Sequence, residues 1–558
     1  MIATTPRGVA AWRFSGERLW QLDDGSIVSW IVANLDARGP SLVTVHADGS
    51  VALHAPGPGR SPFVRLALSG RHDPATSIRS NASGIGARVA ARVAGRWVVD
   101  QTLRSGSGPG QSLTPIAIGA QAIDYVRIDW SDGTFQTETG LAGPGVVRIA
   151  ETQRQLSSCP LLFAWDGRRH AFVSDFLGVG GLGYLVAPGE YATPRPWENF
   201  LFPAGLLQPR DGRYVVKIAE PMEEAAYIDA LRLVAYDLPP GWEMALDERM
   251  QIGAPKVTGQ PFFYLYMLLP ERARNERGED VSAALRSADR RAADPGKIDA
   301  RFIGRLAGEH VLTLYFKEPI EAGSILVADG WIEYPYSQTM FAAWQANAAY
   351  RAPTLEAQGA DGKWRVLLKE FGYPAGMPRT MAVPLPRLPK GTRVLRLRTN
   401  QQIYWDRIAV ARAEEVPAVK HVLPLALARV QHAGFPRRIT GPQHVPDYDY
   451  EQRAPLWDTR VQAGYYTEFG PAEALLAERD DAFAIIGPGE EIHVEFAASA
   501  PPLAAGWTRR FVLETHGWAK DMDLYTRDGE TLGPLPSAGH DPAARENLDR
   551  RFNRRAGF

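Results

Sequence analysis

Hydrophobic and polar residues alternate with a period of two along much of this chain. Residues 87–93 (ARVAARV) and 126–130 (VRIDW) show the alternation clearly. A period of two places one face of a strand in a core and the other face in water. Glycines such as Gly84 and Gly86 separate these stretches and permit tight reversals of the backbone. The pattern predicts an all-β protein made of short strands and turns.

The same alternation continues in the second half of the chain. It predicts strands at residues 311–316, 324–334, 363–368 and 393–411. Strands at this spacing, with turns between them, are typical of a β-sandwich. One good helix is predicted at residues 470–480, with Pro471 in its first turn and strong helix formers after it. The arginine-rich tail from Gly539 is expected to fray.

The length and composition of the chain limit its possible domain number, binding partners and cross-links. The chain has 558 residues, enough for three or four domains, and 62 Lys and Arg against 63 Asp and Glu. This balance and the lack of a basic stripe argue against a nucleic-acid partner. The longest apolar run, residues 261–269, is too short to cross a bilayer. A single cysteine, Cys159, excludes a disulfide within the chain.

Three short motifs in the first third of the chain resemble one family. They are SNASGIGARV at residues 80–89, RSGSG at 104–108 and IDWSDG at 128–133. In this order and spacing they resemble the ASPIC/UnbV module. In its family this β module usually follows an FG-GAP β-propeller in large secreted proteins. The resemblance implies a β module at residues 77–145, but it implies no settled molecular activity.

The segment before this module resembles the last blade of an FG-GAP propeller. In that family a D-x-D-x-D-G loop binds calcium, and here the corresponding loop carries Asn34, Asp36 and Gly39. Calcium needs six to eight oxygen ligands, so this loop is either a weak calcium site or only a turn. Residues 1–76 hold two blades, whereas a propeller usually has four or more. We expect either that the natural start lies upstream of Met1 or that a neighbouring module or partner covers the exposed sheet edge.

The predicted organisation is an incomplete propeller-like unit, followed by the β module and by β-sandwich domains. Three further regions come after the β module. They are a β-rich domain at 155–270, a sandwich at 300–412 and an α+β region at 423–558. In the second of these, DGKW at 361–364 and the run LRLRTNQQIYWDRI at 395–408 resemble a galactose-binding-like jelly roll. That resemblance implies a lectin surface. The candidate ligand-binding rings are Trp331, Tyr334, Tyr336, Trp344, Tyr404 and Trp405, although the position of Trp405 in an alternating strand favours the core for that residue.

A search for catalytic motifs leaves one enzyme class open. Residues 178–183 (GVGGLG) match G-x-G-x-x-G, but the prolines that follow prevent the helix that a dinucleotide site requires. Zinc-protease, P-loop and hydrolase-elbow motifs are absent from the sequence. Glycoside hydrolysis needs two carboxylates about 5–10 Å apart with no fixed spacing in sequence. If the protein is an enzyme, the candidates are Asp175 with Glu190 or Glu198, next to and within the long loop 178–203.

The sequence therefore supports three hypotheses. The first is a non-catalytic binding or adhesion protein that recognises a glycan or protein ligand, at the cell surface, outside the cell or in the periplasm in its full-length form. The second is a carbohydrate-active enzyme with paired carboxylates. The third is a structural scaffold in a larger assembly. Calcium is the one cofactor considered.

Overall fold

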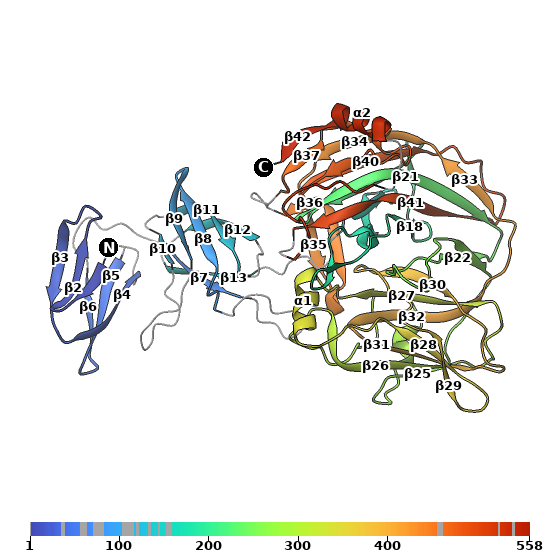
Figure 1. Cartoon of the computed structure of the whole chain (residues 1–558), viewed down its shortest axis with the longest axis horizontal. Helices are drawn as coiled ribbons and strands as arrows, with labels where there is room; N and C mark the ends of the chain where they lie inside the picture. The colour runs from blue at the N-terminus through green and yellow to red at the C-terminus, as the bar shows by residue number, and fades with distance from the viewer. Residues whose placement is uncertain are drawn as a thin grey trace. The chain divides into compact units, whose positions relative to one another are not determined.

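The computed structural model describes residues 2–34, 40–55, 64–70, 83–102, 116–118, 122–131, 135–142, 145–151, 159–454, 461–522, 525–537 and 542–557. The chain divides into two compact units. Unit 1 comprises Met1–Asp73 and Ile78–Arg154, and unit 2 comprises Gln155–Phe558. Strands dominate both units (Figure 1). The prediction of an all-β, multidomain protein is confirmed.

The start of unit 1 contains two antiparallel sheets. One consists of β1 (Ile2–Thr5), β2 (Gly8–Trp12) and β3 (Arg18–Asp23), and the other of β4 (Ile27–Asn34), β5 (Pro40–His46) and β6 (Val51–His54). Each sheet has three strands in the described part of the chain, whereas propeller blades have four. The propeller-like arrangement stays a prediction.

The rest of unit 1 is a β module with its own core. One sheet has the order β12 (Phe135–Ala142), β11 (Ala122–Asp129), β8 (Arg88–Val93) and β9 (Arg96–Thr102), and the other has β10 (Ile116–Ile118), β7 (Val64–Ser69) and β13 (Gly145–Ala150). The strands predicted at 87–93 and 126–130 are confirmed as β8 and β11, and Gly84 and Gly86 have the positive φ angles that their turn requires. The buried side chains of Leu66, Val89 and Val126 belong to one core. Because β7 precedes residue 77 yet pairs in parallel with β13, the module includes a strand from the segment before it.

Unit 2 contains two β-sandwiches, and the first is built from both ends of the unit. Its larger sheet has the order β35 (Phe435–Thr440), β36 (Pro446–Ala454), β15 (His170–Asp175), β14 (Leu161–Trp165), β20 (Arg213–Glu220), β40 (Glu490–Ala497), β34 (Leu425–His432) and β38 (Gly470–Pro471), with β19 (Pro209–Arg210) paired to β20. Its smaller sheet has the order β18 (Trp197–Leu201), β41 (Thr508–Asp521), β21 (Glu224–Leu238) and β33 (Val419–Leu423), with β39 (Ala484–Ile486) paired to β21. Figure 1 shows β41 alongside β21, with which it pairs, and β40 pairs with β20 in the larger sheet. The segments predicted separately at 155–270 and 423–558 thus share one core, which includes Val216, Leu233 and Ile492.

The second sandwich is continuous in sequence. One sheet has the order β24 (Met267–Leu268), β32 (Ile403–Arg412), β27 (Ser324–Ile332) and β30 (Arg379–Pro384), and the other has β25 (Arg272–Arg274), β26 (Arg305–Tyr315), β31 (Val394–Gln401), β28 (Thr354–Gln358) and β29 (Trp364–Leu368). Leu312, Leu326 and Leu397 lie in its core. All the strands predicted between residues 311 and 411 are confirmed.

Short elements complete unit 2. They are the hairpins β16 (Leu185–Ala187) with β17 (Glu190–Tyr191), β22 (Glu243–Leu246) with β23 (Pro261–Tyr264) and β37 (Gly464–Thr467) with β42 (Asn553–Gly557), the helices α1 (Ser337–Gln345) and α2 (Pro542–Phe552), and the 3-10 turns η1 (Gly178–Gly180), η2 (Ser282–Leu285), η3 (Pro442–His444) and η4 (Glu473–Leu475). Neither helix of the described chain is long and apolar enough to span a membrane.

Two local predictions near the C-terminus are wrong. The helix predicted at 470–480 is replaced by β38 and the short turn η4, because Pro471 pairs with Arg429 of β34 and the Ala472 amide donates to the Ala428 carbonyl. In its described residues, 542–557, the tail forms α2 and β42 and is not frayed. Arg555 in β42 forms an ion pair of 2.6 Å with Glu490 and lies against the ring of Tyr466, which holds β42 in place.

Candidate functional site

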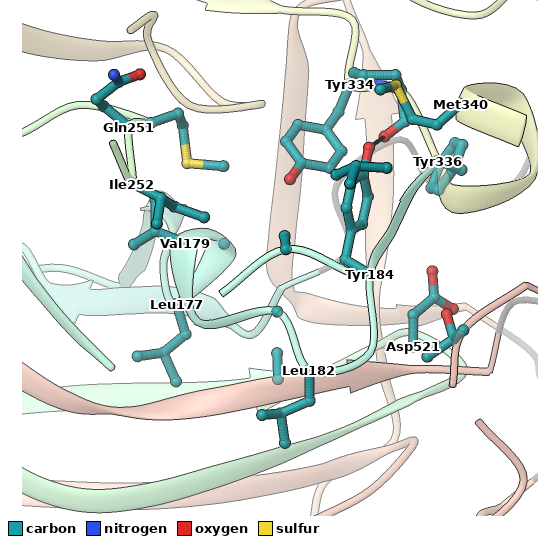
Figure 2. Close-up of a pocket in the computed structure, with 18 of the residues that line it drawn as sticks. Leu177, Val179, Leu182, Tyr184, Gln251, Ile252, Tyr334, Tyr336, Met340 and Asp521 are labelled. Carbon is teal, nitrogen blue, oxygen red and sulfur yellow. Dashed lines mark hydrogen bonds between the residues drawn. The ribbon is translucent and has the colours of Figure 1, made fainter. Parts of the chain in front are cut away.

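A pocket of about 340 Å³ lies in unit 2 between its two sandwiches. Figure 2 shows Val179 and Ile252 on one side of it and Tyr336, Met340 and Asp521 on the other. The lining residues are Leu177–Val179, Gly181, Leu182, Tyr184, Val186, Ala192, Glu224, Met250–Gly253, Tyr334–Tyr336, Met340, Tyr350, Tyr373, Gln401, Ala519, Asp521 and Thr526. Most of these side chains are apolar or aromatic. Volumes of this size and walls of this kind are typical of small-ligand sites.

The glycine run at 178–183 forms one wall of the pocket. Its glycines allow the backbone to approach its neighbours closely, since a Cβ atom on Gly180 would lie 2.8 Å from the Gly517 carbonyl oxygen and one on Gly183 would lie 2.6 Å from that of Arg527. The Leu182 amide donates to the Ala519 carbonyl at 2.8 Å, which ties the loop to β41. No α-helix begins here, so the run serves packing rather than the binding of a dinucleotide.

Tyrosines form much of the opposite wall. The Tyr184 hydroxyl donates to the Pro335 carbonyl at 2.7 Å, drawn as a dashed line in Figure 2. The Leu185 amide donates to the Ser337 hydroxyl at 3.1 Å, which holds the first turn of α1 against the loop. The Tyr350 hydroxyl donates to the Ile303 carbonyl at 2.6 Å. These contacts fix the rings in place, and preorganised walls reduce the entropy that a ligand loses on binding.

Carboxylates lie at one end of the pocket. Glu224 and Asp521 are directly paired in the register of β21 and β41, and both side chains line the pocket. Glu220 lies behind them and is completely buried. Burial raises the pKa of Glu220 well above its usual value and the charge of Asp521 raises it further, while bonds from the Met222 amide and from Glu224 act in the opposite direction. This end of the pocket is therefore acidic.

Gln401, at the end of β31, supplies a further polar group. It is 5% exposed and lines the pocket. Its side-chain oxygen has no hydrogen-bond partner among the described residues. A buried acceptor without a partner costs about 1–3 kcal/mol, so this oxygen is suited to a donor supplied from outside the protein.

The structure brings together two of the three carboxylates predicted from the sequence. Asp175 and Glu198 are 5% and 1% exposed, and both contact the guanidinium of Arg379. Arg379 Nη2 lies 3.4 Å from Asp175 Oδ1, and its Nη1 forms a close ion pair with Glu198. Glu190 lies apart on β17, where it is exposed. None of the three lines the pocket.

This cluster strongly perturbs its carboxyl groups. Burial raises the pKa of Asp175 to about 6, against the lowering effect of Arg379, and the charge of Glu198 raises it. Burial also raises the pKa of Glu248 to about 7, while its ion pair with Arg195 lowers it. Such buried pairs fix strands to one another. Here they connect β15 and β18 of the first sandwich to β30 of the second.

The predicted ligand-binding rings occupy very different positions. Trp331, Tyr404 and Trp405 are 1%, 4% and 1% exposed, and the first two stack on each other at 5.5 Å. They pack inside the protein and present no ring face to a ligand. Tyr334 and Tyr336 line the pocket, and Trp344 on α1 is 54% exposed.

The predicted calcium residues give no structural support for a site. Asp36 lies outside the described residues, and Asn34 is the last residue of β4. No group of three or more His, Cys, Asp or Glu side chains suited to a metal ion occurs in the part of the chain that the structure describes.

Several residues of the pocket were not found from the sequence. Tyr350, Tyr373, Gln401 and Asp521 follow none of the motifs found in the sequence. One feature of the sequence did point to the pocket. Tyr184 directly follows the glycine run, and a glycine run that cannot bind a nucleotide marks a close approach of backbones.

The comparison with protein families concerns unit 1. Residues 77–156 match the family model described as ASPIC and UnbV. This segment is an ASPIC/UnbV domain. It contains the core strands β8 and β11 of the β module, and Trp130, whose indole donates to Gln136 at 2.8 Å, lies at the end of β11. No curated protein matches the sequence significantly. The ASPIC/UnbV domain ends before the pocket begins, so the function of the pocket rests on its own geometry.

Proposed function

We propose that the protein is a non-catalytic binding protein that holds its ligand in the pocket of unit 2. The observation that carries this proposal is the pocket of about 340 Å³, with fixed apolar and tyrosine walls and a few polar groups at defined positions. That combination is typical of sites that bind a ligand without changing shape. An ASPIC/UnbV domain accompanies the pocket in the same chain.

A glycan is the ligand class that the surface beside the pocket favours. Phe341 of α1 stacks on Tyr525 at 4.8 Å, and Trp344 lies 6.0 Å from Phe341. Trp344 and Tyr525 are 54% and 40% exposed. Met340 and Thr526, their neighbours in sequence, line the pocket. Exposed rings of this kind provide apolar faces on which sugar rings stack. We further propose that the full-length protein works at the cell surface, outside the cell or in the periplasm.

The positions of Asp175 and Glu198 argue against these two residues as the catalytic pair of a glycoside hydrolase. A hydrolase needs two carboxyl groups that reach the scissile bond from opposite sides. Asp175 and Glu198 instead share Arg379, and they lie outside the set of side chains that line the pocket. A substrate in the pocket would therefore not meet this pair.

The proposal is tested with a variant that fills the pocket. Gly181 lines it, has φ −59° and ψ 115°, and a Cβ atom there would have its nearest neighbours at 3.7 and 3.9 Å. Gly181→Leu is therefore expected to occupy pocket volume with little backbone strain. Gly308→Leu is the matched control, because Gly308 lies in β26 and a Cβ atom there meets nothing within 4 Å.

The measurement is a glycan array with the full chain, with and without a chelator. We expect wild type and Gly308→Leu to bind the same glycans and Gly181→Leu to lose them. Glycan binding that persists in Gly181→Leu would move the site away from the pocket. Absence of glycan binding by wild type in both conditions would contradict the glycan proposal, and capture of a protein ligand that Gly181→Leu loses would replace the glycan with a protein.

A further inference from the structure

Acceptor groups predominate among the polar side chains of the pocket. Glu224 and Asp521 supply carboxylates and Gln401 supplies an amide oxygen. Among the described residues that line the pocket, none is Lys, Arg or His. A ligand that carried a negative charge would therefore meet like charges and find no basic side chain in the pocket wall.

The tyrosines add to this acceptor character. The hydroxyl hydrogens of Tyr184 and Tyr350 are directed to the protein carbonyls of Pro335 and Ile303, so these hydroxyls offer lone pairs to a ligand. The faces of aromatic rings are also negative and attract cations within about 6 Å. Charge and hydrogen-bonding capacity thus both favour a ligand that is a donor and a cation.

Gln401 is an independent observation in favour of a donor ligand. It belongs to the second sandwich, whereas Glu224 and Asp521 belong to the first. Its side-chain oxygen is buried without a partner in the described structure, and the residue lines the same pocket. An N–H group of a ligand would satisfy this oxygen, and nothing in the argument from Gln401 depends on the carboxylates.

We propose that the pocket binds the ammonium group of an organic cation with an apolar body, which the carboxylates of Glu224 and Asp521 and the amide oxygen of Gln401 recognise. This inference rests on the proposed binding function of the pocket and not on the glycan as its ligand. The apolar body of the ligand contacts Leu177, Val179 and the tyrosine rings.

Three probes of one shape and different charge test the inference by titration calorimetry on the full chain at neutral pH. They are 2-phenylethylammonium, the neutral 2-phenylethanol and the anion 3-phenylpropionate. We expect the ammonium probe to bind about tenfold or more tightly than the alcohol, because hydrogen bonds to charged groups are stronger than those between neutral groups. The carboxylate probe is expected to bind most weakly.

Two variants assign the effect to the named residues. Asp521→Asn is expected to weaken binding of the ammonium probe about tenfold and to leave the alcohol nearly unchanged. Asp528→Asn is the charge-matched control, because Asp528 is 51% exposed and does not line the pocket. Gln401→Leu, which removes an acceptor but no charge, is expected to weaken both donors. Thermal unfolding of each variant checks that it is folded.

The outcomes separate this inference from the proposed function. Equal affinity for all three probes, lost in Gly181→Leu, would overturn the preference for a cation while supporting a binding pocket. Tightest binding of the carboxylate probe would overturn the inference in the same way. Absence of binding by the ammonium probe would also overturn it, while the glycan array with Gly181→Leu would still decide whether the pocket binds a ligand. An ammonium preference that Asp528→Asn lowers as much as Asp521→Asn would show a general charge effect.

Discussion

Unit 2 contains two pairs of carboxylates that differ in their surroundings. Asp175 and Glu198 are buried around the guanidinium of Arg379, which itself is 7% exposed. Glu224 and Asp521 line a pocket whose described lining includes no basic residue. The first pair contacts a buried cation of the protein. The second pair lies at the wall of a pocket large enough for a small ligand.

Under the proposed function, the two pairs differ in their role: the protein's own cation holds the first pair in place, and the second pair contacts the ligand. A buried charge that lacks its partner costs several kcal/mol, so the protein supplies that partner wherever no ligand or water reaches. Burial alone does not distinguish the pairs, because Glu198 and Glu224 are each 1% exposed. The following predictions, from the largest expected effect to the smallest, test this distinction.

Removal of the shared cation is expected to have the largest effect. Arg379→Met leaves Asp175 and Glu198 buried without their guanidinium, and breaking such a buried pair costs about 3–5 kcal/mol. Urea unfolding of unit 2, followed by tryptophan fluorescence, measures the loss. The control is Arg365→Met, which removes an exposed ion pair with Asp361 and should cost much less, because solvent screens exposed ion pairs. Similar losses in both variants would show that the Arg379 cluster has no special structural role.

The pH dependence of stability sharpens the same comparison. Burial raises the pKa of Asp175 from 3.8 to about 6, so the folded chain holds this proton more tightly than the unfolded chain does. The stability that Asp175 contributes is therefore complete below pH 4 and is lost as the pH rises through 6. Asp175→Asn removes this dependence. As the pH rises from 4 to 7, the unfolding free energy of the variant should therefore increase relative to that of wild type by up to about 3 kcal/mol.

An exposed carboxylate provides the control for this pH effect. The hydrogen bonds and ion pair with Arg365 lower the pKa of Asp361 to about 2, so its contribution is present above pH 4 and is lost as the pH falls toward 2. Asp361→Asn should therefore change stability only at acid pH and in the opposite direction. A flat difference between Asp175→Asn and wild type from pH 4 to 7 would contradict the assignment of Asp175.

A pocket carboxylate is expected to matter less for stability. Asp521→Asn removes a charge that raises the pKa of the buried Glu220, so it relieves like-charge crowding. We expect the unfolding free energy at pH 7 to change by less than about 1 kcal/mol, in either direction, while binding of 2-phenylethylammonium weakens. The same urea experiment and calorimetry measure both. A loss of several kcal/mol would place Asp521 in the same class as the Arg379 cluster.

The sequence predicted the strands of this protein well because their pattern is local. The alternation at 87–93 and at 393–411 depends only on which residues face the core, and both stretches form strands. The helix predicted at 470–480 failed for a tertiary reason. Pairing with β34 and burial of Leu475 outweighed the helix propensity of the segment.

The site was predictable only in fragments because its parts are far apart in sequence. Glu224 and Asp521 become neighbours through the register of β21 and β41, which no local pattern encodes. Asp175 and Glu198 were selected as candidates for catalysis, and the structure does bring them together. No motif or spacing pointed to Arg379, the residue whose guanidinium lies between these two carboxylates.

The smallest expected effect on stability separates two tryptophans that are both candidate ligand-binding rings in the sequence. Trp344 is 54% exposed on α1, so Trp344→Ala should change the unfolding free energy by no more than about 0.5 kcal/mol. Trp405 is 1% exposed in the core of the second sandwich, and Trp405→Ala should cost about 3–5 kcal/mol. The effects on glycan binding in the absence of denaturant should have the reverse order. Trp344→Ala should weaken binding more than Trp405→Ala does, since Trp344 offers a ring face to a sugar. If Trp344→Ala leaves glycan binding unchanged, the exposed rings of α1 are not part of the recognition surface.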